Sequence, residues 1–238
     1  MKKIGLFIVL LFVLGKTRAQ IHELGAFVGA SNTIADVGAT HPVYGNSPVY
    51  GLIYKWNITT RYAIRSSFKY STLKSYDYYA QDLSRFSRFL TIDNNVMEFA
   101  LGMEVNFFDF NLHNDDKEIS PYVFAGVGYF QHEAYRFMQT EDQAGTSIYT
   151  PEKYDGELVW SIPLIVGIKA SISPLFIVGL ETGIRYALTD NLDGSNPGGE
   201  FSGDEYKRGN LHNNDWYVFT GLTFSYTFGQ IPCYCKEK

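Results

Sequence analysis

The stretch Trp216–Gly229, which reads WYVFTGLTFSYTFG, decides the fold. Taken every second residue, one side carries Trp216, Val218, Thr220, Leu222, Phe224, Tyr226 and Phe228. The other side carries Tyr217, Phe219, Gly221, Thr223, Ser225 and Thr227. Alternation of this kind predicts a β-strand with one apolar face. That face fits the core of a soluble sheet, but a tilted strand of this length with aromatic ends also fits a lipid bilayer.

Seven further stretches alternate in a similar way, and we predict that they are strands. They are residues 21–30, 49–57, 61–72, 94–108, 119–131, 158–170 and 175–188. The apolar and polar faces are clearly separated in 61–72, and the pattern repeats in 94–108. Both faces of 119–131 are apolar, so the sequence leaves the register of that strand open. The chain is therefore expected to be all-β.

The gaps between the predicted strands alternate between long and short. Long gaps follow the first, third, fifth and seventh strands, and short gaps follow the others. Transmembrane barrels have long external loops at one end and short periplasmic turns at the other. We therefore predict an eight-stranded antiparallel up-and-down transmembrane β-barrel with long extracellular loops and short periplasmic turns. In lipid such a sheet must close, with the first strand pairing with the last.

Charged side chains lie on the face opposite the apolar one. We expect a charge network in the lumen formed by Glu23, Lys55, Arg61, Arg65, Lys69, Glu98, Glu104, Lys169, Glu181 and Arg185. Charges opposite a continuous apolar face fit a barrel whose apolar side meets lipid. The interior of an eight-stranded barrel is just wide enough for side chains to fill. We therefore interpret these charges as a paired plug and not as an ion path or a catalytic pair.

The two ends of the chain differ from the barrel. Residues 1–19 are predicted to be a secretory signal peptide, because two lysines precede an apolar run that ends in a small-x-small cleavage site. Residues 20–229 then form the outer-membrane β-barrel, and 230–238 form a C-terminal tail in the periplasm. Cleavage removes four bases and no acids from a chain of net charge −5, so the mature chain is more acidic and a poor nucleic-acid binder.

Enzyme signatures are missing from the sequence. The five histidines are scattered, and no nucleophile-elbow, zinc-protease or phosphate-loop motif occurs. We therefore expect no catalytic residue, no cofactor, no metal site and no small-molecule substrate. The acidic residues in 190–194 offer carboxylate oxygens of the kind that Ca²⁺ prefers, but they lack the EF-hand spacing. We interpret this segment as a solvated loop.

The chain has two cysteines, Cys233 and Cys235, and both lie in the predicted tail. Their close spacing strains a mutual bridge. A disulfide to a periplasmic partner is therefore a plausible use of these thiols in an exported protein. A mutual bridge and two free thiols are the alternatives that stay open.

Several stretches resemble the small outer-membrane barrels of the Bacteroidetes, and more closely the PorG-like (DUF6089-like) family. They are ELGAFVG (23–29), PVYGLIYKWNITTRYAIR (48–65), EFALGMEVNFF (98–108), SPYVFAGVGYF (120–130) and GLETGIRYALTDNLDG (179–194). The resemblance covers most of the mature chain. It implies a non-catalytic outer-membrane subunit of the type IX secretion system that docks onto periplasmic ring proteins, among them a lipoprotein.

Two other functions stay open at this stage. One is an OmpA-like structural or surface-interaction barrel, unrelated to secretion, in which the external loops make the contacts. The other is a small enzyme barrel or a narrow pore. The docking subunit binds its partner at the periplasmic end, and the OmpA-like barrel binds its partner at the extracellular end. Electrical conductance tests the pore.

Overall fold

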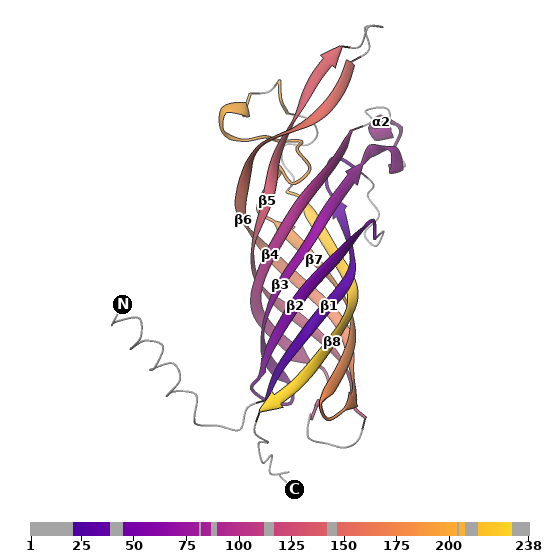
Figure 1. Ribbon diagram of the computed structural model, residues 1–238, viewed down its shortest axis with the longest axis vertical. Helices are drawn as coiled ribbons and strands as arrows, with labels where there is room; N and C mark the ends of the chain where they lie inside the picture. The colour runs from indigo at the N-terminus through magenta and orange to yellow at the C-terminus, as the bar shows by residue number, and fades with distance from the viewer. Residues whose placement is uncertain are drawn as a thin grey trace, which may run out of the picture.

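The computed structural model describes residues 21–38, 45–80, 82–86, 90–111, 117–141, 147–203, 205–207 and 214–229. The strands are β1 (Ile21–Ile34), β2 (Ser47–Asn57), β3 (Tyr62–Tyr76), β4 (Thr91–Asn106), β5 (Ile119–Glu141), β6 (Ser147–Ser173), β7 (Phe176–Ala187) and β8 (Trp216–Gly229). They form one closed barrel in chain order, and each strand is antiparallel to its neighbours (Figure 1). The prediction of an eight-stranded up-and-down barrel is confirmed.

The barrel closes where β1 pairs with β8. The pairing runs the full length of both strands, from Ile21 opposite Gly229 to Ile34 opposite Trp216. A closed ring leaves no strand edge without a partner inside the barrel wall. This is the condition that a β-sheet must meet to lie in hydrocarbon, where an unpaired backbone group costs several kcal/mol.

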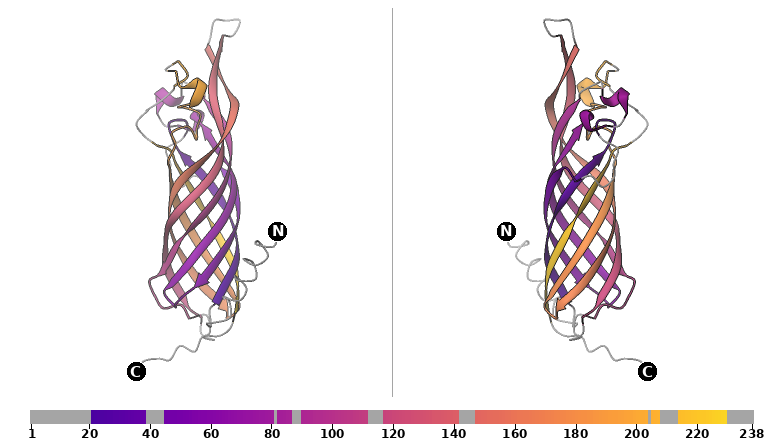
Figure 2. Two further views of the ribbon diagram at one scale, coloured as in Figure 1. Left: turned by 90° about the vertical axis from the view of Figure 1, so that its left-hand side faces the viewer. Right: turned by 90° about the vertical axis from the view of Figure 1, so that its right-hand side faces the viewer.

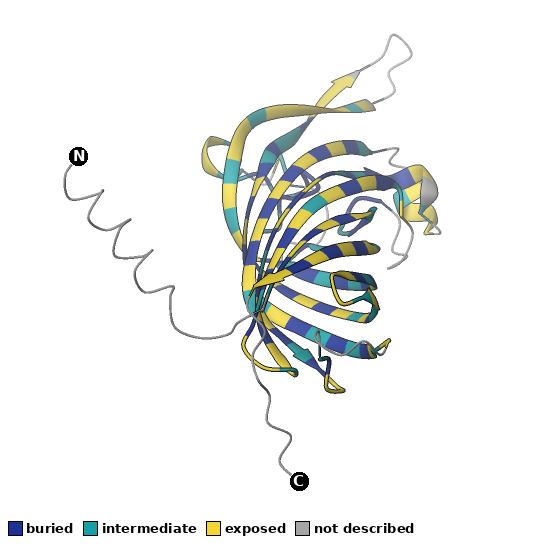
Figure 3. Cartoon of the chain, turned by 60° about the horizontal axis from the view of Figure 1, so that its bottom comes forward, coloured by how far each residue is buried: buried dark blue, intermediate teal, exposed yellow. Residues whose placement is uncertain are grey.

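Buried and exposed residues alternate along the strands of the barrel (Figure 3). In β4, for example, Phe99 and Leu101 face outward and Glu98 faces inward. The same alternation fixes the register of β5, which the sequence left open, with Tyr122 and Phe124 inside. The outer face is thus apolar and the inner face carries the charges, the reverse of a soluble barrel.

Aromatic pairs lie near both ends of the apolar outer face. Tyr129 and Trp160 pack with their ring centroids 4.9 Å apart, near one end. Phe176 and Phe224 stack with centroids 5.4 Å apart, near the other. Aromatic rings that border an apolar band are typical of transmembrane barrels.

The two ends of the barrel differ. The connections 35–46, 77–90, 142–146 and 188–215 share one end, called the loop end below; 58–61, 107–118 and 174–175 share the other, the turn end. The loop end holds the short helices η1 (Asp77–Tyr79), α2 (Leu83–Phe86) and η2 (Gly199–Phe201). In the part of the chain that the structure describes, no helix is long and apolar enough to cross a membrane.

Strands β5 and β6 are much longer than the sequence suggested, with 23 and 27 residues. The ladder between β4 and β5 ends where Met97 faces Gln131, but β5 and β6 stay paired as far as Glu141 and Ser147. Beyond Gln131 the two strands therefore form a ribbon that projects from the loop end (Figures 1 and 2). The prediction of a long loop over 132–157 is wrong, because most of that segment is strand.

Candidate functional site

The barrel interior is filled by charged side chains. All of the predicted interior charges except Arg61 are buried, namely Glu23, Lys55, Arg65, Lys69, Glu98, Glu104, Lys169, Glu181 and Arg185. They come from β1, β2, β3, β4, β6 and β7. Every second side chain of a strand points to the same face, so these side chains all point into the barrel.

Glu104 on β4 is the first centre of this network. Its Oε1 atom lies 2.8 Å from Nζ of Lys55 and 2.8 Å from Nζ of Lys169. Its Oε2 atom lies 3.3 Å from Nη1 of Arg65. One carboxylate on β4 therefore ties together β2, β3 and β6.

Glu181 on β7 is the second centre. Arg65 contacts it with two nitrogens, Nη1 2.8 Å from Oε2 and Nη2 2.8 Å from Oε1. The Lys69 ammonium lies 3.0 Å from Oε1, and the Tyr122 hydroxyl donates to Oε2 over 2.6 Å. Because β3 and β7 are opposite walls of an eight-stranded ring, these contacts join the two sides of the barrel.

The third group joins Glu98 to Arg185, with 3.3 Å between Oε2 and Nε. The Tyr217 hydroxyl also donates to Oε2 of Glu98 over 2.6 Å. Aromatic faces cover the cations as well, since the guanidinium of Arg185 lies 4.4 Å from the ring centroid of Phe219. Tyr122 and Tyr217 were not among the predicted site residues. A tyrosine at an inward position among charges is the signal that points to this role.

Isolated charges are expensive to bury, so a dry interior holds them only when they are paired and hydrogen-bonded. The contacts of Glu104, Glu181 and Glu98 meet that condition. The interior is therefore a packed plug made of ion pairs and aromatic rings.

Arg61 does not belong to this interior. Its side chain is 52% exposed, and its Nε atom lies 2.6 Å from Oδ1 of Asp109 at the turn end. Strand β3 begins one residue later, at Tyr62, so Arg61 lies in the turn and not on the inward face. The expectation that Arg61 joins the lumen network is wrong.

The connection 188–215 closes the loop end of the interior. Leu192 is 1% exposed and packs in the main hydrophobic cluster. Its N–H donates to Oδ2 of Asp215 over 2.9 Å, and its carbonyl accepts from Nδ2 of Asn94 over 2.8 Å. Our interpretation of 190–194 as a solvated loop is wrong, because residues 191–194 are buried.

Two buried aspartates, Asp193 and Asp215, hold the connection 188–215, called the loop plug below, in place. Asp193 accepts the N–H groups of Val37 over 2.7 Å and of Ser195 over 2.9 Å. Burial raises the pKa of Asp193 above its usual value. Burial, helped by the charge of Asp193, raises the pKa of Asp215 well above its usual range. The loop plug therefore contains carboxyl groups that resist ionisation.

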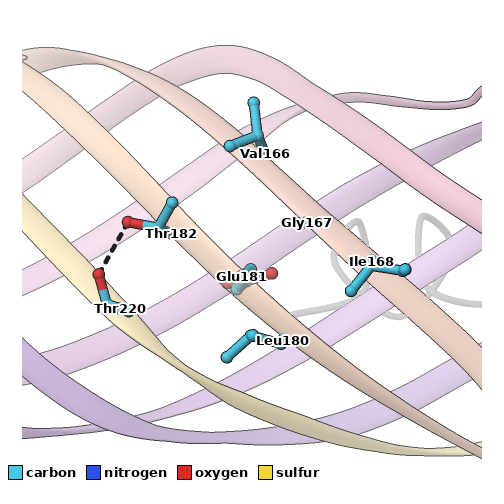
Figure 4. Close-up of a pocket in the computed structure, with 7 residues that line it drawn as sticks. All are labelled: Val166, Gly167, Ile168, Leu180, Glu181, Thr182 and Thr220. Atoms are coloured by element: carbon cyan, nitrogen blue, oxygen red, sulfur yellow. Dashed lines mark hydrogen bonds between the residues drawn. The ribbon is translucent and has the colours of Figure 1, made fainter.

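A hollow of about 400 Å³ lies on the outer wall, where β6, β7 and β8 meet (Figure 4). The hydroxyls of Thr182 and Thr220 are 2.7 Å apart in it and hydrogen-bond to each other. Val166 and Leu180 flank the pair. The two polar groups satisfy one another, as groups on an apolar outer face must, so the hollow offers no unsatisfied group to a ligand.

Cys233 and Cys235, together with residues 1–19, lie outside the described residues. The disulfide prediction and the signal-peptide prediction therefore stay predictions.

A closed sheet with an apolar outer face, aromatic borders and a charged, filled interior defines the class of protein. It is a transmembrane β-barrel of the kind that bacterial outer membranes hold. The chain belongs to the family described as Domain of unknown function (DUF6089), whose model matches residues 2–237. Of the resemblance noted in the sequence, the DUF6089 membership is thereby confirmed. No curated protein matches the chain.

Several solved structures are similar to this chain. Ail, the attachment invasion locus protein of Yersinia pestis, is 12% identical with a TM-score of 0.45, covering 89% of this chain and 100% of Ail. A major outer membrane protein from Thermus thermophilus is 11% identical with a TM-score of 0.47, covering 89% and 100%. Neisserial surface protein A is 10% identical with a TM-score of 0.42, covering 88% and 96%. At these values the likeness says nothing of function.

Proposed function

We propose that this protein is a non-catalytic outer-membrane barrel that serves as a docking subunit of the type IX protein secretion machinery. In this role its turn end and C-terminal tail contact periplasmic ring proteins, including a lipoprotein. The observation that carries the proposal is the filled interior. A barrel whose core is occupied by the contacts of Glu104 and Glu181 has only its two ends and its outer wall with which to act.

The sequence motifs support the choice of machinery. The stretches 48–65, 98–108 and 179–194 resemble the PorG-like barrels. These stretches contain most of the buried interior charges. The residues that carry the resemblance are therefore largely the residues that fill the interior. The chain ends support the choice of side, because Ile21 and Gly229 pair at the turn end. The proposal places that end in the periplasm.

The test compares the intact protein with a form that lacks residues 230–238, each expressed in cells deleted for the native gene. We expect the intact protein to co-purify with periplasmic ring proteins from gently solubilised membranes and to restore secretion. The shortened protein should reach the membrane folded and do neither. A non-reducing gel of whole membranes tests the disulfide separately.

The matched control shortens the ribbon at 142–146 and leaves the tail intact. Under the proposal this variant keeps its ring partners and restores secretion. If the tail-deleted barrel secretes normally and keeps its partners, the docking role is wrong.

The projecting ribbon favours a second function, that of a surface-interaction barrel unrelated to secretion. Beyond Gln131, within the described residues, β5 has no strand partner other than β6. A two-stranded ribbon with open edges is a common docking element for extended peptides. This function predicts the opposite result, with partners lost on shortening the ribbon and kept on deleting the tail.

A further inference from the structure

A pocket of about 370 Å³ lies at the loop end, between the projecting part of β6 and the helix η2. Its aromatic walls are Tyr154 and Phe201, whose rings meet edge to face with centroids 5.1 Å apart. Its charged groups are the carboxylates of Asp155, Glu157 and Glu200. Of the described residues that line it, none is basic. The pocket therefore combines negative charge with aromatic surface.

His132 lies next to this pocket, because it is paired across the β5–β6 ladder with Glu157, one of the residues that line the pocket. It lies beyond Gln131, outside the membrane-spanning part of β5, and its side chain is fully buried. Its Nδ1 atom lies 3.1 Å from the carbonyl oxygen of Glu133, which only accepts, so Nδ1 carries the proton. Burial lowers the pKa of His132, so the ring stays neutral at neutral pH and Nε2 is an acceptor.

Nε2 of His132 has no hydrogen-bond partner among the described residues. The nearest charged atom recorded for it is Oε2 of Glu157, at 3.7 Å, which is too long for a hydrogen bond. An imidazole acceptor and a carboxylate acceptor thus face one another at the wall of the pocket. This arrangement favours a positively charged donor beside them.

The ribbon itself shows how it holds such a group. The guanidinium of Arg136 lies 3.8 Å from the ring centroid of Phe201. The same guanidinium pairs with Oε2 of Glu152 at 2.7 Å. One arginine of this chain is therefore held between an aromatic face and a carboxylate, the two kinds of group that also line the pocket.

We infer that the pocket binds a basic side chain, lysine or arginine, of a polypeptide that reaches the loop end. The ammonium or guanidinium donates to Glu157, and its alkyl stem lies against Tyr154, because Arg136 already covers the ring of Phe201. A metal ion suits the pocket less well. Within the described ranges no three His, Cys, Asp or Glu side chains are grouped closely enough to hold one.

The test uses the full-length protein folded in detergent micelles and two probes, N-acetyl-arginine amide and N-acetyl-lysine amide. Binding is followed by the ring ¹⁵N resonances of His132 and by calorimetry. We expect saturable binding with a shift of Nε2. Glu157→Gln should weaken it about tenfold, as loss of a charge-assisted hydrogen bond predicts. Glu200→Gln should also weaken it, because it removes a second carboxylate that lines the pocket. The second variant guards against misfolding, because Glu200 is exposed.

Asp93→Asn is the matched control. It removes one carboxylate at the loop end that does not line the pocket, and its amide oxygen can still accept from Tyr76. Affinity in this variant should stay within about twofold. The inference is overturned by no saturation, by equal binding of N-acetyl-glutamine amide, or by unchanged affinity in Glu157→Gln. Displacement of the basic amides by millimolar CaCl₂ with tighter binding of the metal would also overturn it.

Discussion

Arg65 and Glu181 meet inside the barrel in a two-pronged ion pair, with both nitrogen–oxygen distances at 2.8 Å. The pair links β3 to β7 across the interior, and both side chains are almost fully buried. The energy of such a pair appears mainly when one member is removed, because the other is then left as an uncompensated buried charge.

Replacement of Arg65 by leucine should therefore destabilise the barrel by about 3 to 5 kcal/mol. Urea unfolding in lipid vesicles measures this. Arg61→Leu is the matched control, because it breaks an Arg–carboxylate pair that is open to solvent. That variant should unfold at the same urea concentration as the parent. Equal effects of the two substitutions would show that the interior is wet.

The filled interior also predicts an electrically silent protein. Purified barrels inserted in planar bilayers should give no stepwise conductance, because Tyr122, Phe124 and the ion pairs around Glu104 occupy the cross-section. A porin in the same bilayer serves as the positive control. Reproducible steps from the intact protein would restore the narrow-pore reading and remove the main support for the docking role.

The apolar outer face predicts that the cost of a charged substitution depends strongly on whether the side chain lies in the lipid or outside it. Leu101 lies on that face, midway along the part of β4 that pairs with β5, so Leu101→Arg should cost about 2 to 4 kcal/mol of folding free energy in lipid. Leu83→Arg makes the same chemical change in α2 at the loop end, where the side chain is 82% exposed. It should cost no more than about 0.5 kcal/mol. The folded fraction on unheated gels reports both values, and a mild Leu101→Arg would argue that lipid does not bathe this face.

The sequence predicts the barrel well because a period of two is enforced on every strand that has lipid on one side and a packed interior on the other. Glu98 and Phe99, adjacent on β4, show the pattern clearly. The ribbon beyond Gln131 keeps it only in part. His132 and Ala134 are still buried, but the register shifts between Ala134 and Tyr135, and most of the residues that follow are exposed or half-buried. In the ribbon, β5 and β6 remain strands because their hydrogen-bonded pairing continues beyond the barrel. This pairing leaves no pattern in the local sequence.

The loop plug and the loop-end pocket were hidden from the sequence for a related reason. Leu192 is one apolar residue among Asp, Asn and Gly, and its burial depends on the mouth that the surrounding strands build around it. His132 and Glu157 are brought together only by the register between β5 and β6. Charges at a strand end, such as Arg61, are equally hard to place, since a boundary error of one residue moves the side chain from the interior to solvent.

The aspartates of the loop plug predict a pH dependence. A carboxyl group whose pKa is raised by folding contributes stability that is complete below the pKa of the unfolded chain and is lost as the pH rises through the folded-state pKa. Burial raises the pKa of both Asp193 and Asp215. The plug should therefore be tighter in mild acid than at neutral pH.

Hydrogen exchange of the Leu192 and Ser195 amides measures this tightness. After correction for the intrinsic rate, protection should fall by several fold as the pH rises from mildly acidic to neutral. Asp215→Asn keeps an oxygen that can accept from the Leu192 N–H and removes the charge, so its protection should change less with pH. Protection that rises with pH in the parent protein would contradict the raised pKa values.

Two glycines at the loop end make the last prediction, because both have a positive φ but only one is enclosed. Gly194 has φ of +74°, and a Cβ built on it lies 3.1 Å from Cδ1 of Ile92 and 3.2 Å from Cβ of Tyr135. Gly199 has φ of +64°, and no atom lies within 4 Å of its Cβ position. Alanine at either position bears the cost of the left-handed conformation, about 1 kcal/mol. At Gly194 the added methyl group must also push against the packed residues of the connection, so Gly194→Ala should speed proteolysis of the connection 188–215 several fold more than Gly199→Ala does.

The barrel itself should unfold at an unchanged urea concentration in both variants, because its ladders do not involve either residue. If Gly194→Ala is cleaved no faster than Gly199→Ala, the loop does not fill the mouth of the barrel in solution.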